Sequence, residues 1–179
     1  LMLFLFYCYF RNGFNFEIFK TKKENKLLFV YGTLKRGFHW HDKFLFESKF
    51  ISNAKTVDLF ALVMGDSGVP YLLLETPSAK QQPQHIVGEL FAVNAATLKS
   101  LDDYEGVIKG YYVRKEIDVV LDNGQVMRAD CYLKKEVSSD LVSRPFLKEY
   151  ALQTHNEHYQ PIRHIEAKQQ LYMQENQLH

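Results

Sequence analysis

Apolar and polar side chains alternate most regularly between residues 113 and 133. Eight apolar residues at odd-numbered positions share one face of two extended segments; they are Val113, Ile117, Val119, Leu121, Met127, Ala129, Cys131 and Leu133. The turn sequence Asp122-Asn123-Gly124 separates the two segments. Alternation with a period of two around such a turn is typical of antiparallel strands that bury one face. The pattern therefore predicts a β-hairpin.

Shorter apolar runs bounded by turn residues predict further strands. They cover residues 27–30, 57–64, 71–74 and 85–93, with a loop over residues 65–70. Directly after the last run, Asn94 is a typical N-cap for a helix over residues 95–105. Gly106 follows at the position where a left-handed residue often ends a helix.

The chain changes character after Leu133. The sequence Ser143-Arg144-Pro145 resembles a helix start, and Phe146, Leu147, Tyr150 and Ala151 follow at helical spacing. A second helix is predicted over residues 161–172, and the polar residues 173–179 are expected to fray.

The first 25 residues differ from the rest. Residues 1–10 are apolar throughout but too short for a membrane span, which needs about 20 residues. They also lack the charge and the cleavage site of a signal peptide. A charged run over residues 20–26 then precedes the first strand. We therefore divide the chain into an N-terminal extension (1–25), one domain (26–150) and a helical tail (151–179).

Composition narrows the classes of partner. The 179 residues include 22 basic and 21 acidic side chains, so no electrostatic reason exists to expect nucleic acid or an anionic membrane. A small neutral or zwitterionic ligand fits this balance better. The two cysteines, Cys8 and Cys131, are far apart and are interpreted as reduced thiols of a cytoplasmic protein. The oligomeric state is left open.

Glu105 is the unusual carboxylate of the predicted helix. At about 100° per residue it projects between the directions of Leu98 and Leu101, whereas Asp103 lies on the opposite face and Asp102 on the flank, as solvated carboxylates do. Apolar surroundings raise the pKa of a carboxylate towards the range that a general acid or base needs at neutral pH. In the alternative interpretation, Glu105 turns to solvent or pairs with Lys109 or Arg114.

The stretch VYGTLKRG, residues 30–37, predicts an anion-binding turn. Gly32 lets the backbone approach a ligand, and the amides of Thr33, Leu34 and Lys35 form an anion-binding concavity if they turn to one side. The spacing of a nucleotide-binding P-loop is absent. The alternative is an ordinary turn that carries two surface cations.

Metal binding and ordinary hydrolysis are the weaker hypotheses. The pairs His39/His41 and His155/His158 lack any further ligand at metal-binding spacing, so we expect exposed histidines and no metal. Cys131 and Ser67 lack a general base at any diagnostic spacing, so nucleophilic hydrolysis is a distant possibility.

Five short motifs, taken in order, resemble a known family. They are Tyr31-Gly32-Thr33-Leu34, Val69-Pro70-Tyr71-Leu72-Leu73, Val87-Gly88-Glu89-Leu90-Phe91, Leu101-Asp102-Asp103-Tyr104-Glu105 and Tyr111-Tyr112-Val113-Arg114. The combination is similar to the γ-glutamyl cyclotransferase superfamily, the AIG2-like proteins, and most of all to the γ-glutamylamine cyclotransferases. The resemblance covers about residues 26–135. It implies a compact α+β fold with a mixed, barrel-like sheet and a few short helices.

The resemblance also implies a reaction and a site. A γ-glutamyl amine or amino acid is cleaved by attack of its own α-amine, which gives 5-oxoproline and a free amine without metal or cofactor. Carried over by position, the general acid/base is Glu105, and the substrate-binding residues are Tyr31, Gly32, Thr33, Leu34 and Tyr112. Alternation puts Tyr112 and Arg114 on one face, which either lines the pocket or faces solvent.

Two questions stay open at this point. A non-catalytic module that binds a small ligand or a protein is the alternative function. The loop over residues 75–84, which contains Pro77 and Pro83, leaves the identity of the released amine undetermined.

Overall fold

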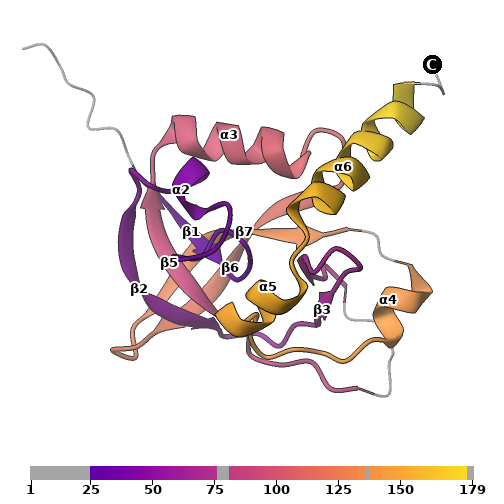
Figure 1. Cartoon of the computed structure of the whole chain (residues 1–179). Helices are drawn as coiled ribbons and strands as arrows, with labels where there is room; N and C mark the ends of the chain where they lie inside the picture. The colour runs from indigo at the N-terminus through magenta and orange to yellow at the C-terminus, as the bar shows by residue number, and fades with distance from the viewer. Residues whose placement is uncertain (1–24, 76–80, 136–137, 177–179) are drawn as a thin grey trace, which may run out of the picture.

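The fold is centred on a closed five-stranded barrel. The computed structural model describes residues 25–75, 81–135 and 138–176, so the predicted N-terminal extension lies outside the described residues except for its last residue. The barrel strands follow the order β1 (Lys26–Val30), β5 (Val87–Val93), β2 (Lys49–Thr56), β6 (Tyr112–Leu121) and β7 (Val126–Lys134). Neighbouring strands are antiparallel, but β7 and β1 are parallel where they close the barrel (Figure 1). The α+β fold with a mixed, barrel-like sheet is confirmed.

The predicted hairpin forms β6 and β7. Val113 pairs with Leu133 and Ile117 with Ala129 in an unbroken antiparallel register. Most of the odd-numbered residues of these strands, Cys131 among them, belong to the apolar core, as the alternation indicated. The other face carries Tyr112 and Tyr132, which pack in a second apolar cluster beneath α3 (Ala95–Glu105).

Strand β2 was missed, and the strand predicted over residues 57–64 is wrong over its first half. A register shift between Phe50 and Ser52 breaks the alternation of β2, and of its residues only Ala54 and Thr56 are buried. Val57 is partly exposed beyond the end of β2. The apolar run forms a strand only at β3 (Leu62–Met64), which pairs with β4 (Pro70–Leu72) in a separate two-stranded sheet.

Helix α3 begins and ends where the sequence predicts. The side chain of Asn94 accepts a hydrogen bond from the amide of Thr97, and Gly106 adopts a left-handed conformation with φ of 67°. Buried Leu98 and Leu101 face the barrel. The short helix α2 (His41–Phe44) lies beside α3, and α3 runs across the barrel in Figure 1.

The helix predicted to start at Ser143 is wrong, because a helix ends there instead. Helix α4 (Ser139–Ser143) stops before Arg144, which is extended because Pro145 follows it. The next residues serve the sheet rather than a helix: the amide of Leu147 donates to the carbonyl oxygen of Leu62 at 2.8 Å. The apolar residues after Pro145 therefore have helical spacing in the sequence but lie in a non-helical segment.

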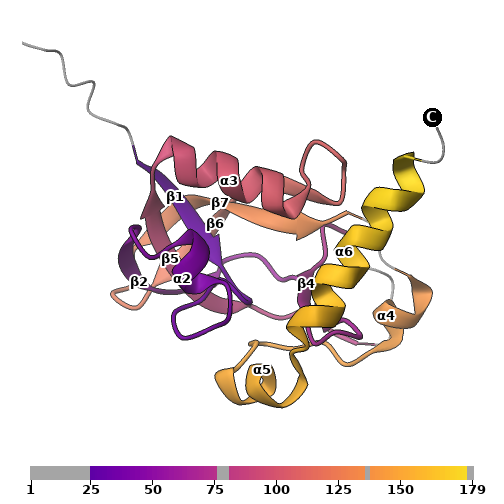
Figure 2. The same ribbon diagram turned by 45° about the horizontal axis from the view of Figure 1, so that its top comes forward.

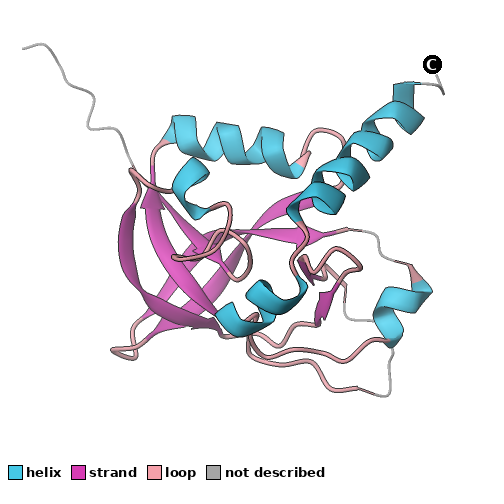
Figure 3. Ribbon diagram, viewed as in Figure 1, coloured by secondary structure: helices cyan, strands magenta, loops and turns pink. Residues whose placement is uncertain are grey.

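Two helices complete the described chain. Helix α5 (Leu152–His158) is followed by α6 (Pro161–Asn176), whose predicted start is confirmed and which extends beyond the predicted end. Figure 2 shows α6 starting close to β4 and leading away to the C-terminal end. In Figure 3 the helices lie outside the barrel strands. Within the described segments, no helix has the length and apolar character to cross a bilayer.

Candidate active site

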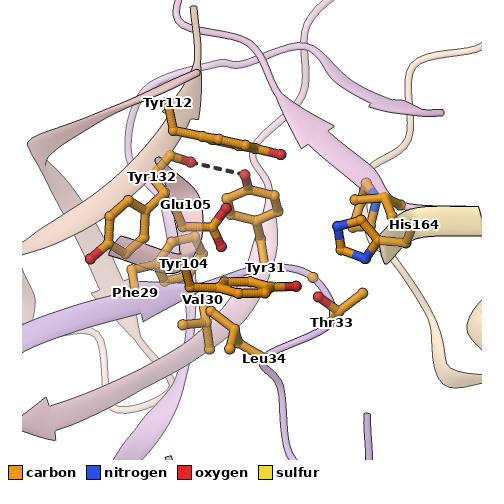
Figure 4. A pocket seen from close by; sticks show the side chains of 13 residues that line it. Phe29, Val30, Tyr31, Thr33, Leu34, Tyr104, Glu105, Tyr112, Tyr132 and His164 are labelled. Carbon is orange, nitrogen blue, oxygen red and sulfur yellow. Dashed lines mark hydrogen bonds between the residues drawn. The ribbon is translucent and has the colours of Figure 1, made fainter. Parts of the chain in front are cut away.

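A single pocket contains all six residues predicted for the site. They are Tyr31, Gly32, Thr33, Leu34, Glu105 and Tyr112, which come from β1 and its following loop, the end of α3, and β6. The cavity holds about 40 Å³, which admits on the order of three water molecules. Figure 4 shows the carboxylate of Glu105 among the rings of Tyr31, Tyr104 and Tyr132. Their chemical roles remain predictions.

The loop after β1 is a tight turn held by its own backbone. The amide of Lys35 donates to the carbonyl oxygen of Gly32, and the amide of Trp40 donates to that of Thr33, both at 3.0 Å. A Cβ atom on Gly32 would lie 2.6 Å from Cγ of Pro70. Glycine is therefore required at position 32 for close packing against Pro70 at the start of β4, rather than for a positive φ.

The predicted anion-binding concavity is smaller than expected. The Lys35 amide is committed to Gly32, so the prediction that it joins the concavity is wrong. Within the described part of the chain, the amides of Thr33 and Leu34 donate to no protein acceptor. The amide of Arg36 already donates to a carboxylate oxygen of Glu89 at 2.9 Å. The loop after β1 therefore already binds one carboxylate of the protein, that of Glu89, through a main-chain amide.

The two cations of this loop behave differently from each other. Lys35 is only 5% exposed, lies over the ring of Phe38 and pairs with Glu149 at 3.5 Å. Burial lowers the pKa of its ammonium group, although Glu149 acts in the opposite direction. Arg36 is exposed, and its guanidinium stacks on the ring of Phe50. The interpretation of both residues as surface cations is therefore wrong for Lys35.

Glu105 occupies the last turn of α3 on the side that faces the barrel. Its side chain lines the pocket and is partly exposed. Its negative charge contributes to the raised pKa values of Tyr31 and Tyr112, for which burial is the larger cause. The carboxylate thus lies close enough to both phenols to interact with them electrostatically.

Asp102 and Arg114 form an ion pair outside this pocket. Nε of Arg114 donates to Asp102 at 2.8 Å, and a second guanidinium nitrogen of Arg114 donates to Asp130 at 3.0 Å. Asp102 also accepts a hydrogen bond from the hydroxyl of Tyr132 at 2.8 Å. The expectation that Asp102 is an ordinary solvated carboxylate is therefore wrong. Asp103 is exposed, as expected, and pairs with Lys99 on its own helix.

Tyr31, Tyr112 and Tyr132 of the pocket are held as neutral phenols. The hydroxyl of Tyr31 donates to the carbonyl oxygen of Tyr132 at 2.9 Å. Burial raises the pKa of Tyr31, Tyr112 and Tyr132 well above the usual value, and Asp102 adds to the shift of Tyr132. Tyr112 is 7% exposed, so of its two predicted placements the structure selects the pocket.

Sequence reasoning missed several pocket residues. Val69 and Pro70 belong to a motif of the family resemblance, which could have indicated them. Tyr132 lies on the face of β7 opposite Cys131, so the alternation of that strand could have indicated it. His164 carried no signal, because it lies in a mostly polar helix. It is buried at the pocket, and its Nδ1 atom lies 2.9 Å from the hydroxyl oxygen of Tyr159.

The residues considered for metal binding or for nucleophilic hydrolysis lie outside the pocket. His155 is buried, contrary to the expected exposed histidine, while His39 and His158 are exposed. Among the described residues, no three His, Cys, Asp or Glu side chains gather as a metal site would require. Cys131 is fully buried in the barrel core, where burial raises the pKa of its thiol, which opposes a nucleophilic role.

Comparisons with known proteins agree with this architecture. The family model described as "Gamma-glutamyl cyclotransferase, AIG2-like" matches residues 28–172, so the match extends far beyond the residues of the motif resemblance. Gamma-glutamylaminecyclotransferase B of Danio rerio is 32% identical over 133 residues, 69% of this chain and 67% of that protein. MJ1514 of Methanocaldococcus jannaschii, provisionally assigned as a gamma-glutamylcyclotransferase, is 36% identical over 69% of this chain and 96% of its own length.

A solved structure has the same arrangement. The crystal structure of an AIG2-like protein from Mus musculus superposes with a TM-score of 0.63 and 28% sequence identity. The alignment covers 72% of this chain and 89% of the mouse chain. The names of these relatives support γ-glutamyl cyclotransferase activity. With its barrel, its motifs and a family match over most of its length, the chain belongs to the γ-glutamyl cyclotransferase, AIG2-like family.

Proposed function

We propose that this protein cleaves a γ-glutamyl amine or γ-glutamyl amino acid and releases 5-oxoproline and the free amine. The observation that carries the proposal is the shared pocket of Glu105 and the turn that contains Thr33 and Leu34. A carboxylate and a set of main-chain donors suit opposite ends of an amino-acid head group. Family membership favours the same reaction class.

In the first step, Glu105 prepares the nucleophile. Its carboxylate accepts a proton from the substrate α-ammonium group, and the resulting amine attacks the γ-carbonyl carbon of the same molecule. A five-membered ring forms as the new carbon–nitrogen bond closes. Because nucleophile and electrophile belong to one molecule, a fixed conformation in the pocket supplies much of the acceleration.

In the second step, the amine departs. Protonated Glu105 returns its proton to the leaving nitrogen, the original γ-amide bond breaks, and the tetrahedral centre collapses to the lactam carbonyl. Main-chain donors of the loop stabilise negative charge on the substrate, and the hydroxyl of Tyr112, a neutral phenol at physiological pH, is a further donor in reach of the pocket. The ring nitrogen gives its second proton to the regenerated Glu105 carboxylate, which passes it to the released amine, so that the amine departs as an ammonium ion and the proton balance closes without another reactant.

The size of the cavity indicates how strictly the protein selects the amine that is released. A space of about 40 Å³ is too small to enclose a whole γ-glutamyl substrate. We therefore expect the glutamyl head group to enter the pocket while the amine portion extends towards the surface. Such an arrangement favours tolerance for several amines over strict recognition of one.

A substrate panel tests the proposal. The protein is incubated with γ-glutamyl-ε-lysine, γ-glutamyl amino acids, glutathione and simple γ-glutamyl alkylamides, and 5-oxoproline is quantified. We expect its formation from at least one member in equal amount to the released amine. A folded protein that forms no 5-oxoproline from any member contradicts the proposal, and saturable binding without turnover would favour the non-catalytic module instead.

A further inference from the structure

A groove of about 310 Å³ adjoins the candidate active site. It is lined by the turn between β3 and β4, by α4 and by one face of α6, which lie close together in Figure 2. Pro70 lines the pocket and Tyr71 lines the groove. On α6, His164 lines the pocket and Arg163 lines the groove. The two cavities therefore share their walls, and the groove has the volume of a small-molecule site.

The turn between β3 and β4 is held in place by the C-terminal region. The carbonyl oxygen of Ser67 accepts a hydrogen bond from the amide of Gln160 at 2.9 Å, and that of Gly68 accepts one from the hydroxyl of Tyr150 at 2.6 Å. Gly68 has a φ of 73°, and a Cβ atom there would collide with the main chain of His158. The position of Ser67 relative to α6 is therefore fixed before any ligand binds.

The hydroxyl of Ser67 indicates that the groove receives a polar ligand. Ser67 is 8% exposed and lines the groove, yet its hydroxyl makes no hydrogen bond within the described part of the chain. A hydroxyl that is largely withdrawn from water and has no partner is energetically unfavourable, and native proteins contain few of them. A polar group that enters the groove from outside the chain would supply the missing partner.

The groove also carries both signs of charge on one face of α6. Arg163 and Glu166 are exposed and three residues apart, so their side chains leave the helix on the same side. Neither forms an ion pair with any residue that the structure describes. Asp66, in contrast, already pairs with Arg144. A guanidinium and a carboxylate are thus available to a ligand that carries both charges.

We propose that the groove binds the head group of an α-amino acid. The guanidinium of Arg163 and the hydroxyl of Ser67 bind the α-carboxylate, and the carboxylate of Glu166 binds the α-ammonium group. The ligand is a free amino acid or the amine portion of a γ-glutamyl substrate whose glutamyl group occupies the adjoining pocket; the second source rests on the proposed function. Because these contacts involve the head group alone, they do not select one amino-acid side chain.

Three related probes test the groove directly. L-Alanine carries both charges, L-alaninamide lacks the carboxylate, and N-acetyl-L-alanine lacks the ammonium group. Each is titrated into the full chain, and the dissociation constant is obtained from the NMR shifts of the amide signals of Ser67 and Gln170, which line the groove. The amide of Thr33 reports binding in the adjoining pocket separately. We expect L-alanine to bind at the groove with a dissociation constant on the order of 1–10 mM.

Variants that remove one charge assign each end of the ligand. Arg163→Gln should weaken L-alanine binding about 3- to 10-fold and leave L-alaninamide unchanged, because that probe has no carboxylate to lose. Glu166→Gln should weaken L-alanine by a similar factor and leave N-acetyl-L-alanine unchanged. Arg128→Gln, at an exposed position of β7 outside the groove, is the control and should change neither. Equal weakening of all three probes, or no saturable shift with L-alanine, overturns the proposal.

Ser67→Ala tests the hydroxyl. The hydroxyl has no partner among the described residues, so its removal should leave the melting temperature unchanged while L-alanine binding weakens. A lower melting temperature with unchanged L-alanine binding would overturn the role of Ser67.

Kinetics distinguish the two sources of the amino acid. γ-Glutamyl-ε-lysine presents an α-amino-acid head group at the far end of its amine portion, and γ-glutamyl pentylamide is the matched substrate without that head group. If the groove holds the amine portion, Arg163→Gln and Glu166→Gln raise KM for the first substrate about 3- to 10-fold and leave kcat and the pentylamide reaction unchanged. If it holds a free amino acid, both KM values stay the same although L-alanine binding is weakened.

Failure of the proposed function gives a different result. A protein that forms no 5-oxoproline from either substrate but binds L-alanine through Arg163 and Glu166 refutes the cyclotransferase reaction and leaves the groove in place. Conversely, normal turnover without L-alanine binding at the groove, and without an effect of either variant on KM, refutes the groove alone.

Discussion

The pocket side chains of residues 26–134 stand on paired barrel strands, the loop after β1 and a capped helix, whereas His164, from residues 138–176, stands on a helix outside the barrel and is also held by a side-chain hydrogen bond. Glu105 is set by a helix capped at Asn94 and Gly106, and Tyr112 by the register of β6 with β7. His164, in contrast, reaches the pocket from a helix and is held by the hydroxyl of Tyr159. The two regions nevertheless contribute opposite walls of one cavity.

Under the proposed function, this difference means that the catalytic carboxylate and the C-terminal wall of the pocket are positioned by different kinds of contact. Backbone pairing fixes the barrel residues within a sheet whose register resists slippage, because a slip would expose the core face. The contact of His164 with Tyr159 depends on individual side chains, so a single substitution there can alter the pocket while the strand register stays the same. We expect the catalytic group to depend on the first region and substrate recognition on both.

Deletion of α6 is expected to give the largest effect, because it removes the C-terminal wall of the pocket and leaves the barrel intact. A chain that ends at Gln160 loses His164 and opens the pocket to water, so we expect kcat/KM to fall about 100-fold or more. Ile162 and Met173 are largely exposed, and the melting temperature should fall by only about 2–4 °C, the shift for ~1 kcal/mol. Steady-state kinetics and thermal denaturation measure the two effects. Full activity of the shortened chain would contradict the account.

Gly32→Ala tests the packing on the barrel side. The added Cβ would lie 2.6 Å from Cγ of Pro70, so the loop or the start of β4 must move. We expect a loss of about 1–3 kcal/mol in the free energy of unfolding and a raised KM, measured by urea titration and kinetics. Gly110→Ala, where φ is 76° and no atom lies within 4 Å of the new Cβ, is the control. It should lose stability but keep its KM.

Tyr150→Phe tests the side-chain network of the C-terminal region. The buried hydroxyl donates to the carbonyl oxygen of Gly68 at 2.6 Å and lies 3.0 Å from Nδ1 of His155. Removing it leaves both partners unsatisfied, so the free energy of unfolding should decrease by about 1–3 kcal/mol in a urea titration. Stability equal to that of the unchanged protein would mean that this network contributes nothing.

His155 gives the smallest predicted effect, a dependence on pH. Its pKa is lowered, chiefly by burial and then by His39, and its two nitrogens already serve Tyr150 and the amide of His39. The unfolded chain therefore takes up a proton near the usual pKa of about 6.5 while the native imidazole stays neutral. Stability from this group is present above about pH 6.5 and is lost as the pH falls below it.

His155→Gln removes the titrating group and serves as the reference. The difference in unfolding free energy between the unchanged protein and His155→Gln should shrink as the pH is lowered from about 7.5 to about 5.5. Urea titrations at several pH values measure it. A difference that stays constant or grows would show that His155 does not titrate as its burial indicates.

Local signals explain what the sequence could predict. The caps of α3 lie within a few residues of the helix they bound, and the alternation of β6 and β7 reflects a core on one side only. These patterns placed Glu105 on the inner side of its helix and Tyr112 on a strand, but the choice of both as site residues also needed the family motifs. The family motifs added Gly32, whose reason for being glycine is the contact with Pro70.

Long-range contacts explain what the sequence could not predict. Strand β2 was hidden by a register shift after Phe50, and the apolar residues around Leu147 follow helical spacing although they pair with β3. Lys35 is polar by type but buried, because Glu149, 114 residues later, provides its partner. His164 has no apolar pattern around it, and only the fold reveals its place in the pocket.

The central claim is that Glu105 moves the protons of the reaction, and Glu105→Gln tests it most directly. Glutamine keeps the shape of the side chain but cannot accept a proton. With an active γ-glutamyl substrate, the account predicts that kcat falls at least about 100-fold while the dissociation constant of the substrate, measured by calorimetry, changes only a few-fold. Glu105→Gln protein that releases 5-oxoproline at the rate of the unchanged enzyme would contradict the account.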